Sequence, residues 1–338
     1  MAVTIKDVAK KAGVSISTVS KAIHDNPSIP AATKQRIFNA MKELNYYPNI
    51  IARSFAQQSS YHIGLIMSLN REDAFLNPYI YEILSGAEEI AKKNGYLITL
   101  INMSTVVNDC KELERLIMQK SVDGFLIHLA GFDPKLVKIL KKHNFPLVYI
   151  GRPWFESSEC WVDIDNARAG EIAAKHLIDS GCERIAFIGD GLNNYICKMR
   201  YEGYQKALLS SGLELKNEYA KDMSNTNIPA LVDELAAMKE PPDGLVCSNN
   251  FIAFEVLKCL NKKKIRVPED MALITFDNYP FAPYTEPKMS VVDIDVYELG
   301  IQSADILIKK LKTPALTMQC SLLSPTLVAR ESTRKTED

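Results

Sequence analysis

The stretch KKAGVSISTVSKAI, residues 10–23, has the apolar spacing of an amphipathic helix, yet Gly13, Val14 and Ser15 interrupt it. Glycine costs about 1 kcal/mol relative to alanine inside a helix, and serine prefers helix caps to helix interiors. We therefore expect Gly13 to end one helix in the left-handed conformation, Val14 to fill the corner and Ser15 to cap a second helix. The stretch predicts two short helices joined by a tight turn.

The flanking residues complete a small helical head. Thr4 and Asp7 have the spacing of a capping box, which predicts a first helix over residues 5–12. The second helix is expected over residues 16–24 and a third over residues 31–44. The apolar residues expected on the inner faces of the three helices are Val8, Ala9, Ala12, Val19, Ile23, Ile37, Phe38, Met41 and Leu44.

Positive charge is concentrated in this head. The chain has 338 residues and a net charge of −1, but residues 1–60 carry eight Lys or Arg against three Asp or Glu, a net +5, which leaves −6 on the rest. A basic head on an acidic body is typical of polyanion binding. Together with the turn chemistry it favours a helix-turn-helix that places its second helix in the DNA major groove. The alternative is a three-helix bundle that does not bind DNA.

The segment NYYPNIIARSFAQQ, residues 45–58, predicts a short hinge helix after the head. Pro48 stops the third helix and Asn49 is a candidate cap. A helix of about two turns is unstable alone in water, so it is expected to form only against DNA or a second copy of itself. Phe55 is then a candidate wedge in the minor groove. The alternative is a linker in which Phe55 packs on the body.

Four segments of the head carry a family resemblance: TIKDVAKKAGVSISTVSKAI (4–23), Thr33, LNYYPN (44–49) and ARSF (52–55). They resemble the DNA-binding head of the LacI/GalR family of bacterial repressors. The resemblance, continuous over residues 3–57, implies a homodimer that binds double-stranded operator DNA. It also implies that the operator is pseudo-palindromic, with one head on each half-site.

The same resemblance implies DNA contacts position by position. It implies base contacts, the last two in the central minor groove, from Ile16, Ser17, Lys21, Ala52 and Phe55. It implies phosphate contacts from Thr4, Ser15, Thr18, Ser20, Thr33, Tyr46 and Asn49.

Three departures from the family pattern prevent a prediction of the operator sequence by analogy. Phe55 stands where the family usually has leucine, Lys21 where it usually has arginine, and His24-Asp25 where it usually has two asparagines. Lysine lacks the planar fork with which arginine reads guanine.

The remaining residues predict an α/β body built twice. HIGLIMSL (62–69) and RIAFIGD (184–190) are strand-like runs that each lead to a helical segment, and VDGFLIH (122–128) is repeated in PPDGLVCS (241–248). Continuous apolar strands that alternate with helices are typical of parallel sheets with helices on both faces. The body also resembles the effector-binding core of the same family, which is built like a periplasmic sugar-binding protein.

We therefore predict a small all-α head joined by a hinge helix to an α/β core of two similar lobes. The expected parts are a helix-turn-helix domain over 1–47, a hinge helix and linker over 48–60, and an effector-binding and dimerisation core over 61–338. The expected lobes are an N-lobe of 61–161 plus 293–321 and a C-lobe of 162–292 plus 322–332. No leucine heptad follows Arg330, so we expect a dimer without a coiled-coil tetramer tail.

Polar residues follow the ends of several predicted strands of the body. Ligands bind at the carboxyl ends of parallel strands, so these side chains are expected in a cleft between the lobes. Carboxylates accept hydroxyl protons and a guanidinium donates a planar fork, which suits a polyhydroxy ligand. The family resemblance implies effector contacts at the same positions, which are Asp165, Arg200, Asn249 and Asp277.

Two features of this region bear on the ligand. Asn250 stands where most members of the family have aspartate, which loosens a loop hydrogen bond or changes the ligand class. The aromatic residues that could stack on a sugar ring, with ordinary packing or a dimer surface as the alternative, are Phe75, Tyr79, Trp154 and Phe155.

Composition excludes several other classes of protein. Hydrophobic residues make up 47% and charged residues 24%, with no run of about 18 apolar residues and no export signal, which favours a cytoplasmic protein. Seven widely spaced cysteines without Cys-x-x-Cys, and five histidines without His-Glu-x-x-His, give no reason to expect a disulfide framework, a metal or a cofactor.

Together with the family resemblance, these observations predict a ligand-responsive repressor of carbohydrate-utilisation genes, with a sugar or sugar phosphate in the cleft. The resemblance also implies two alternatives for control, a purine corepressor or a phosphorylated carrier protein. An enzyme acting on a sugar is remote, because GDGLNN (189–194) lacks the third glycine of a dinucleotide-binding loop and no nucleophile–base set is present. A solute receptor has no use for a helix-turn-helix head.

Overall fold

The computed structural model divides into two units, residues 1–61 and 62–338, and each folds around its own core. The residues that the structure describes are 3–23, 26–46, 59–69, 79–191, 194–223 and 226–333. Most of the predicted hinge helix, with Asn49, Ala52 and Phe55, lies outside them, as does Phe75.

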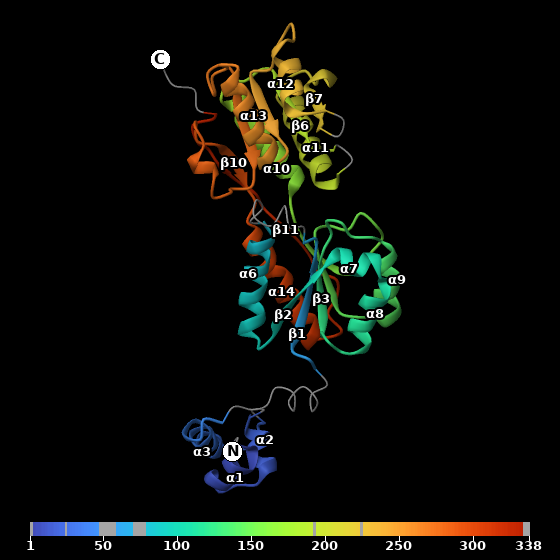
Figure 1. The fold of residues 1–338 in the computed structure, drawn as a ribbon, viewed down its shortest axis with the longest axis vertical. Helices are drawn as coiled ribbons and strands as arrows, with labels where there is room; N and C mark the ends of the chain where they lie inside the picture. The colour runs from blue at the N-terminus through green and yellow to red at the C-terminus, as the bar shows by residue number, and fades with distance from the viewer. Residues whose placement is uncertain are drawn as a thin grey trace. The chain divides into compact units, whose positions relative to one another are not determined.

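The head contains the three predicted helices: α1 (Ile5–Ala12), α2 (Ile16–Ile23) and α3 (Ala31–Glu43) (Figure 1). Gly13 has φ 62° and ψ 40°, so the predicted left-handed turn between α1 and α2 is confirmed. The Ser15 hydroxyl accepts a hydrogen bond from the Thr18 amide at 3.1 Å and caps α2.

The inner face of α3 differs from the prediction at one position. Phe38 is 42% exposed, so its predicted place in the core is wrong. The buried stripe of α3 runs from Ile37 through Ala40, Met41 and Leu44, at the i, i+3, i+4 and i+7 spacing of one helix face. Phe38 lies about 100° around the helix from Ile37 and therefore points away from the core.

The body contains two six-stranded sheets of the same strand order, β11-β5-β4-β3-β1-β2 and β12-β10-β9-β8-β6-β7. The strands of the first are β1 (His62–Met67), β2 (Leu97–Asn102), β3 (Gly124–His128), β4 (Leu147–Ile150), β5 (Cys160–Ile164) and β11 (Cys320–Leu323). The strands of the second are β6 (Ile185–Gly189), β7 (Ala220–Asp222), β8 (Gly244–Cys247), β9 (Ala272–Phe276), β10 (Ser290–Asp293) and β12 (Thr326–Val328). Among the described pairs, β10 with β12 is antiparallel and the others are parallel.

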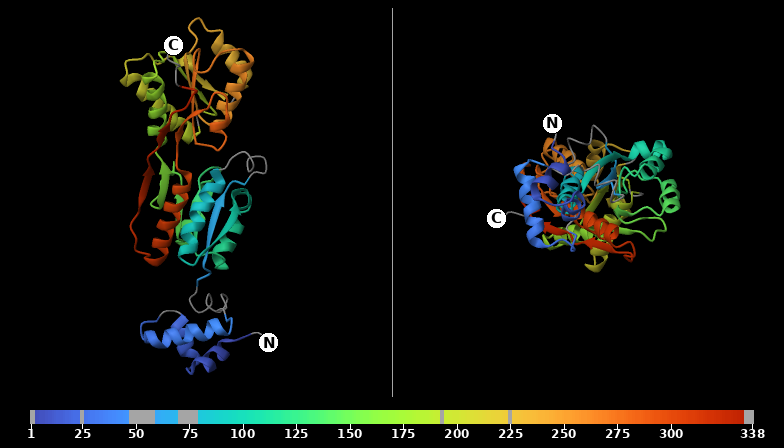
Figure 2. Two further views of the ribbon diagram at one scale, coloured as in Figure 1. Left: turned by 90° about the vertical axis from the view of Figure 1, so that its left-hand side faces the viewer. Right: turned by 90° about the horizontal axis from the view of Figure 1, so that it is seen from below.

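Helices cover both faces of each sheet, as predicted (Figure 1, Figure 2). Around the first sheet lie α6 (Tyr79–Lys93), α7 (Met103–Asn108), α8 (Cys110–Met118), α9 (Lys135–His143) and α14 (Val296–Lys312). Around the second lie α10 (Asn166–Asp179), α11 (Tyr195–Ser210), α12 (Ile228–Ala236) and α13 (Asn250–Lys262). No helix in the described part of the chain is both long enough and apolar enough to cross a membrane.

The chain passes between the two sheets three times, slightly later than the predicted lobe boundaries. Strand β5 continues to Ile164 and β11 to Leu323, because these two strands pair in parallel register up to that residue pair. The first and third crossings therefore follow Ile164 and Leu323 rather than residues 161 and 321. Strand β10 ends at Asp293 in the second sheet, and α14 then packs on the first.

Two glycines bring α10 and α11 unusually close together in the second lobe. A Cβ atom on Gly170 would lie 1.9 Å from the Arg200 carbonyl oxygen, and one on Gly203 would lie 1.9 Å from the Ala167 carbonyl oxygen. Any larger residue would push the helices apart. This close packing positions the backbone of Arg200 against the start of α10.

Candidate functional site

The exposed face of α2 carries the residues predicted to contact bases. Ile16 is 44% exposed, and Ser17 and Lys21 are exposed beside it. Val19 and Ala22, on the opposite face, are fully buried in the core of the head. The helix therefore presents a methyl-rich side chain, a hydroxyl and a flexible cation, which suit base edges and phosphates.

Three of the residues predicted to contact phosphates lie at helix starts. Thr4 precedes α1, Ser15 precedes α2, and Thr33 lies in the first turn of α3, where backbone amides favour anions. The Thr4 hydroxyl donates to the Asp7 carboxylate at 2.7 Å, and this bond lowers the pKa of Asp7. Thr4 must share its hydroxyl with that carboxylate if it is to bind a phosphate. The remaining described members of the set, all half-buried, are Thr18, Ser20 and Tyr46.

Arg200 is the central residue of the predicted effector site. It is 4% exposed, and Nε donates to Asn166 Oδ1 at 3.0 Å while Nη1 donates to the Ser248 carbonyl at 2.6 Å. Nη2 lies 3.6 Å from Asp277 Oδ1. The guanidinium also lies 4.3 Å from the ring centroid of Phe276. Arg200 is therefore held on several sides by its own lobe.

Asp277 follows β9 with a left-handed φ of 67°. Burial raises the pKa of Asp277, while the nearby Arg200 charge opposes that shift. Its Oδ1 accepts no hydrogen bond from any described residue. The Asp277 carbonyl accepts from Asn250 Nδ2 at 2.9 Å, and Asn250 Oδ1 is also buried without a hydrogen bond among the described residues. Two acceptor atoms in one cluster thus have capacity for a donor.

The other two predicted effector residues serve as helix caps. Asp165 Oδ1 accepts from the Arg168 amide at 2.9 Å at the start of α10. Asn249 Oδ1 accepts from the Ile252 amide at 3.1 Å at the start of α13, and its Nδ2 donates to Asp190 Oδ2 at 3.0 Å. These bonds orient Asn166 and Asn250, the next residues in the chain, toward Arg200 and Asp277.

The N-lobe contributes Tyr79, His128 and Asp163 to the same region. The ring centroids of Tyr79 and His128 are 5.5 Å apart in an edge-to-face contact. Burial lowers the pKa of His128 to about 4 and raises that of Tyr79, which also feels the charges of Asp163 and Asp277. Asp163 Oδ2 accepts from the Arg152 amide at 2.9 Å, and burial raises its pKa.

Sequence reasoning missed several of these residues. Asp190 ends a predicted strand, so the strand-end rule that selected Asp277 could also have found it. Asn166 and Ser248 contact Arg200 from distant positions, and His128 is one histidine among five; none carries a motif of its own. Of the stacking candidates described, Trp154 and Phe155 pack edge-to-face, and Phe155 stacks on Phe132 in the N-lobe core.

A cavity of about 300 Å³ lies at this cluster. It is lined by Tyr79 and Glu82 of α6, by residues 277–280 after β9, and by residues 293–297 before α14. Both lobes therefore contribute to it, as the predicted cleft requires.

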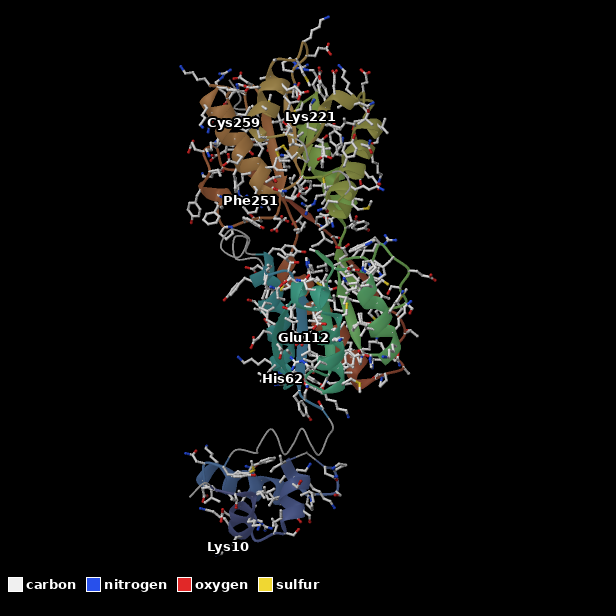
Figure 3. All side chains as sticks on the ribbon, turned by 45° about the vertical axis from the view of Figure 1, so that its right-hand side comes forward. Lys10, His62, Glu112, Lys221, Phe251 and Cys259 are labelled. Atoms are coloured by element: carbon white, nitrogen blue, oxygen red, sulfur yellow. The ribbon has the colours of Figure 1, made fainter. Side chains whose placement is uncertain are left out.

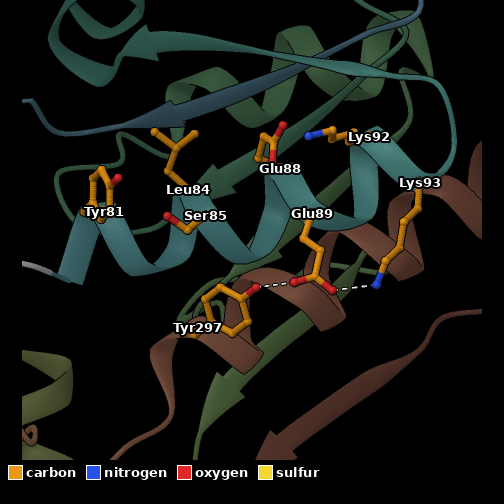
Figure 4. Close-up of a pocket in the computed structure, with 8 residues that line it drawn as sticks. All are labelled: Tyr81, Leu84, Ser85, Glu88, Glu89, Lys92, Lys93 and Tyr297. Atoms are coloured by element: carbon orange, nitrogen blue, oxygen red, sulfur yellow. Dashed lines mark hydrogen bonds and ion pairs between the residues drawn. The ribbon is translucent and has the colours of Figure 1, made fainter.

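A larger groove of about 700 Å³ runs along α6 but contains none of the predicted effector residues (Figure 4). There Glu89 accepts a hydrogen bond from the Tyr297 hydroxyl and forms an ion pair with Lys93 at 2.5 Å. The smaller cavity is the candidate ligand site, because it includes Asp277.

Residues 4–49 match the family described as bacterial regulatory proteins, lacI family. Residues 174–333 match the periplasmic binding protein-like domain. Two similar curated proteins are both named HTH-type transcriptional repressor PurR. The protein from Photobacterium profundum is 30% identical over 336 residues, covering 98% of each chain. The protein from Vibrio vulnificus is 29% identical over 338 residues, covering 98% of this chain and 99% of that one.

Two solved structures match over nearly the whole chain. The complex of the transcriptional regulator CelR with cellobiose has a TM-score of 0.74 and 27% identity, and the match covers 98% of this chain and 100% of that one. The lac repressor dimer bound to operator and the anti-inducer ONPF has a TM-score of 0.78 and 21% identity, with coverage of 99% and 100%. The second likeness concerns the fold alone.

Proposed function

Since the chain belongs to the lacI family of bacterial regulatory proteins and is a DNA-binding transcriptional repressor rather than an enzyme, we propose that it represses carbohydrate-utilisation genes in the cytoplasm in response to a sugar. The observation that carries the carbohydrate proposal is the buried Arg200–Asp277 pair. Its neighbours Asn166 and Ser248 orient the guanidinium, and Asp277 Oδ1 is left to accept from a ligand. Hydroxyl groups supply such donors.

We further propose that α2 reads the operator and that other polar residues of the head and hinge hold its phosphates. The proposed base contacts are Ile16, Ser17, Lys21, Ala52 and Phe55. The proposed phosphate contacts are Thr4, Ser15, Thr18, Ser20, Thr33, Tyr46 and Asn49. The exposure of Ile16, Ser17 and Lys21 on one face of α2 supports this assignment.

A homodimer is part of the proposal. Strand β2 is an edge of the first sheet, and its Leu97 and Leu100 are 58% and 42% exposed. Phe281 and Tyr284 are exposed in the second lobe, as is Phe251 at the start of α13 (Figure 3). An apolar edge strand favours pairing with another chain. A two-fold dimer would present two heads to a pseudo-palindromic operator.

The cleft supports a simple mechanism of control. A ligand that contacts both lobes stabilises one arrangement of the lobes over another, and it changes operator affinity only by its preference between them, typically 1–3 kcal/mol. A sugar that prefers the DNA-bound arrangement acts as a corepressor. One that prefers the other arrangement acts as an inducer.

The experiment starts with selection of an operator from random DNA by the purified chain. The dissociation constant for that operator is then measured with and without neutral sugars, sugar phosphates and purines. A change of fivefold or more with a sugar supports the carbohydrate proposal. A change with purines alone contradicts it.

A purine corepressor is the second candidate. It is favoured by the name PurR of two relatives that match nearly the whole chain. Tyr79 and Tyr279 line the cavity and offer aromatic faces for a flat ring. The purine arm of the operator experiment separates the two candidates.

A further inference from the structure

We infer that the cleft selects uncharged polyhydroxyl ligands and rejects their phosphate esters. This inference rests on the proposed carbohydrate response and narrows it, because sequence reasoning alone leaves sugars and sugar phosphates equally open. Three features of the described residues carry it: the charge of the cavity wall, the hydrogen bonds of Arg200 within its own lobe, and two buried acceptor atoms beside it that receive no hydrogen bond.

The wall of the 300 Å³ cavity is acidic. Its described lining residues include Glu82, Asp277, Asp293 and Asp295, and no lysine or arginine is among them. A phosphate ester carries a charge between −1.5 and −2 at neutral pH. Such a group would face several like charges at short range, whereas an uncharged hydroxyl could donate to the carboxylates.

Two described arginines near the cluster, Arg200 and Arg152, have protein partners. Arg200 directs Nε to Asn166, Nη1 to the Ser248 carbonyl and Nη2 to Asp277. The guanidinium of Arg152 lies over the Trp161 ring, 5.6 Å from its centroid. Phosphate binding by arginine depends on a free planar fork with two parallel N–H donors. Since Nε and Nη1 of Arg200 each already donate to a protein acceptor, a phosphate would have to displace or share one of these partners to receive two parallel N–H donors.

Arg330 is engaged as well. It donates from Nη1 to the Met289 carbonyl at 2.8 Å and from Nη2 to Asn278 Oδ1 at 2.7 Å. Asn278 in turn donates to Asp293 Oδ2 at 3.2 Å. Through Asn278, the Arg330 guanidinium thus helps to position the Asp293 carboxylate of the cavity wall.

The cluster also contains two buried acceptor atoms that receive no hydrogen bond from a described residue. Asn250 is 2% exposed, and its Oδ1, like Asp277 Oδ1, accepts no hydrogen bond from a described residue. The two side chains are linked, because Asn250 Nδ2 donates to the Asp277 carbonyl. A sugar hydroxyl has a proton to donate to such atoms, but a fully ionised phosphate has only acceptor oxygens. The hydrogen-bonding chemistry and the charge therefore favour the same ligand class.

The test is calorimetric titration of the full chain at constant ionic strength with matched pairs of ligands. The pairs are ribose and ribose 5-phosphate, glucose and glucose 6-phosphate, and cellobiose and cellobiose 6-phosphate, with inorganic phosphate as a further probe. We expect at least one neutral sugar to bind, and its phosphate ester to bind on the order of 100-fold more weakly.

Two variants on α6 test whether the carboxylates of the cavity wall cause the weaker binding of phosphate esters. Glu82→Gln removes a carboxylate from the cavity wall, and it should narrow the ratio between the two dissociation constants by about tenfold. Glu88→Gln makes the same charge change on the same helix, outside the cavity, and should leave the ratio as in wild type. An equal ratio in both variants would overturn the inference.

The remaining outcomes separate the inference from the proposed function. A phosphate ester that binds as tightly as its neutral partner overturns the inference and leaves the carbohydrate response standing. Saturable binding of inorganic phosphate that is lost in Arg200→Lys also overturns it, because Arg200 would then be free to hold anions. Binding of neither class contradicts both the inference and the carbohydrate proposal.

Discussion

Asp277 combines burial with a charge, and that combination suits it to a ligand-sensing role. Burial raises the pKa of its carboxyl group, and Arg200 at 3.6 Å opposes the shift. The left-handed φ of 67° places the side chain next to the guanidinium at the end of β9. A hydrogen-bond donor from a ligand would give Asp277 Oδ1 its missing hydrogen bond. Ligand binding would therefore change the interaction between Asp277 and Arg200.

Replacement of Asp277 tests this role. We expect Asp277→Ala to abolish the effect of the sugar on operator affinity, because the acceptor for its hydroxyl is removed, while operator affinity without sugar changes by less than about threefold. Asp179→Ala, which removes a carboxylate exposed on α10 of the same lobe, is the control. A sugar dose curve in Asp277→Ala equal to that of wild type would show that the cleft is assigned wrongly.

Burial of His128 makes the stability of the core depend on pH. Its pKa is lowered from 6.5 to about 4, because burial disfavours the charged ring. Between these two values the unfolded chain binds a proton that the folded chain does not. The contribution to the free energy of unfolding is therefore fully present above pH 6.5 and is lost as the pH falls toward 4.

We expect His128→Gln to lose about 1–2 kcal/mol less stability than wild type between pH 7 and pH 4. The effect is modest because His128 is only half-buried and solvent screens its charge. Urea unfolding of the full chain at pH 7, 6, 5 and 4 measures the effect. The same pH dependence in the variant and in wild type would contradict the prediction.

At the scale of helices, the crossing of α10 and α11 places Arg200. Gly170 and Gly203 let the two backbones approach, and Asn166 at the start of α10 then lies within hydrogen-bond distance of Arg200 Nε. The position of Arg200 thus depends on Gly170 and Gly203, two residues that have no side chain with which to contact a ligand.

A methyl group at this crossing should separate the helices. We expect Gly170→Ala to lower the free energy of unfolding by about 2–3 kcal/mol, because the added Cβ would lie 1.9 Å from the Arg200 carbonyl oxygen. It should also weaken the ligand response through the displaced guanidinium. Lys175→Ala, on an exposed face of the same helix, is the control for thermal unfolding. An unchanged midpoint in Gly170→Ala would show that the crossing adjusts without cost.

At the scale of the whole molecule, the two lobes repeat one topology but end differently. Strand β11 runs parallel to β5, whereas β12 runs antiparallel to β10, because the chain crosses directly from the end of β11 to the second sheet. The residues after β12 are built into that sheet: Ser332 is fully buried and donates to the Leu273 carbonyl at 2.6 Å. The second lobe therefore includes the last described residues of the chain.

The proposed dimer is tested at this scale as well. We expect Leu100→Asp to convert the dimer into a monomer at micromolar concentration and to weaken operator binding more than tenfold, because a charge on the β2 edge opposes burial against a second copy. Sedimentation velocity and an operator titration measure the two effects. Leu209→Asp changes another exposed leucine, on α11, and should alter neither. A dimeric Leu100→Asp would place the interface elsewhere.

Local chemistry in the sequence determined the head. A helix cap, a left-handed glycine and an i, i+3, i+4 stripe each involve residues within about one or two turns of one another, so Thr4–Asp7, Gly13 and Ser15 predicted α1 and α2 correctly. The apolar runs likewise predicted parallel sheets, because strands buried on both faces are apolar throughout. Phe38 was misplaced because its side of α3 depends on the packing of three helices.

The surroundings of the candidate site depend on contacts between residues that are far apart in the chain. The partners of Arg200 lie 34 and 48 residues away from it in the chain, at Asn166 and Ser248. The sequence marked Asp277 at a strand end and Arg200 in the helical segment after the strand of residues 185–189. It carried no sign of their spacing, of an Asn250 oxygen without a hydrogen bond from a described residue, or of the acidic wall. Such features arise when separate strand ends converge, and the free energy of burial, charge and hydrogen bonding there depends on distances that local sequence does not contain.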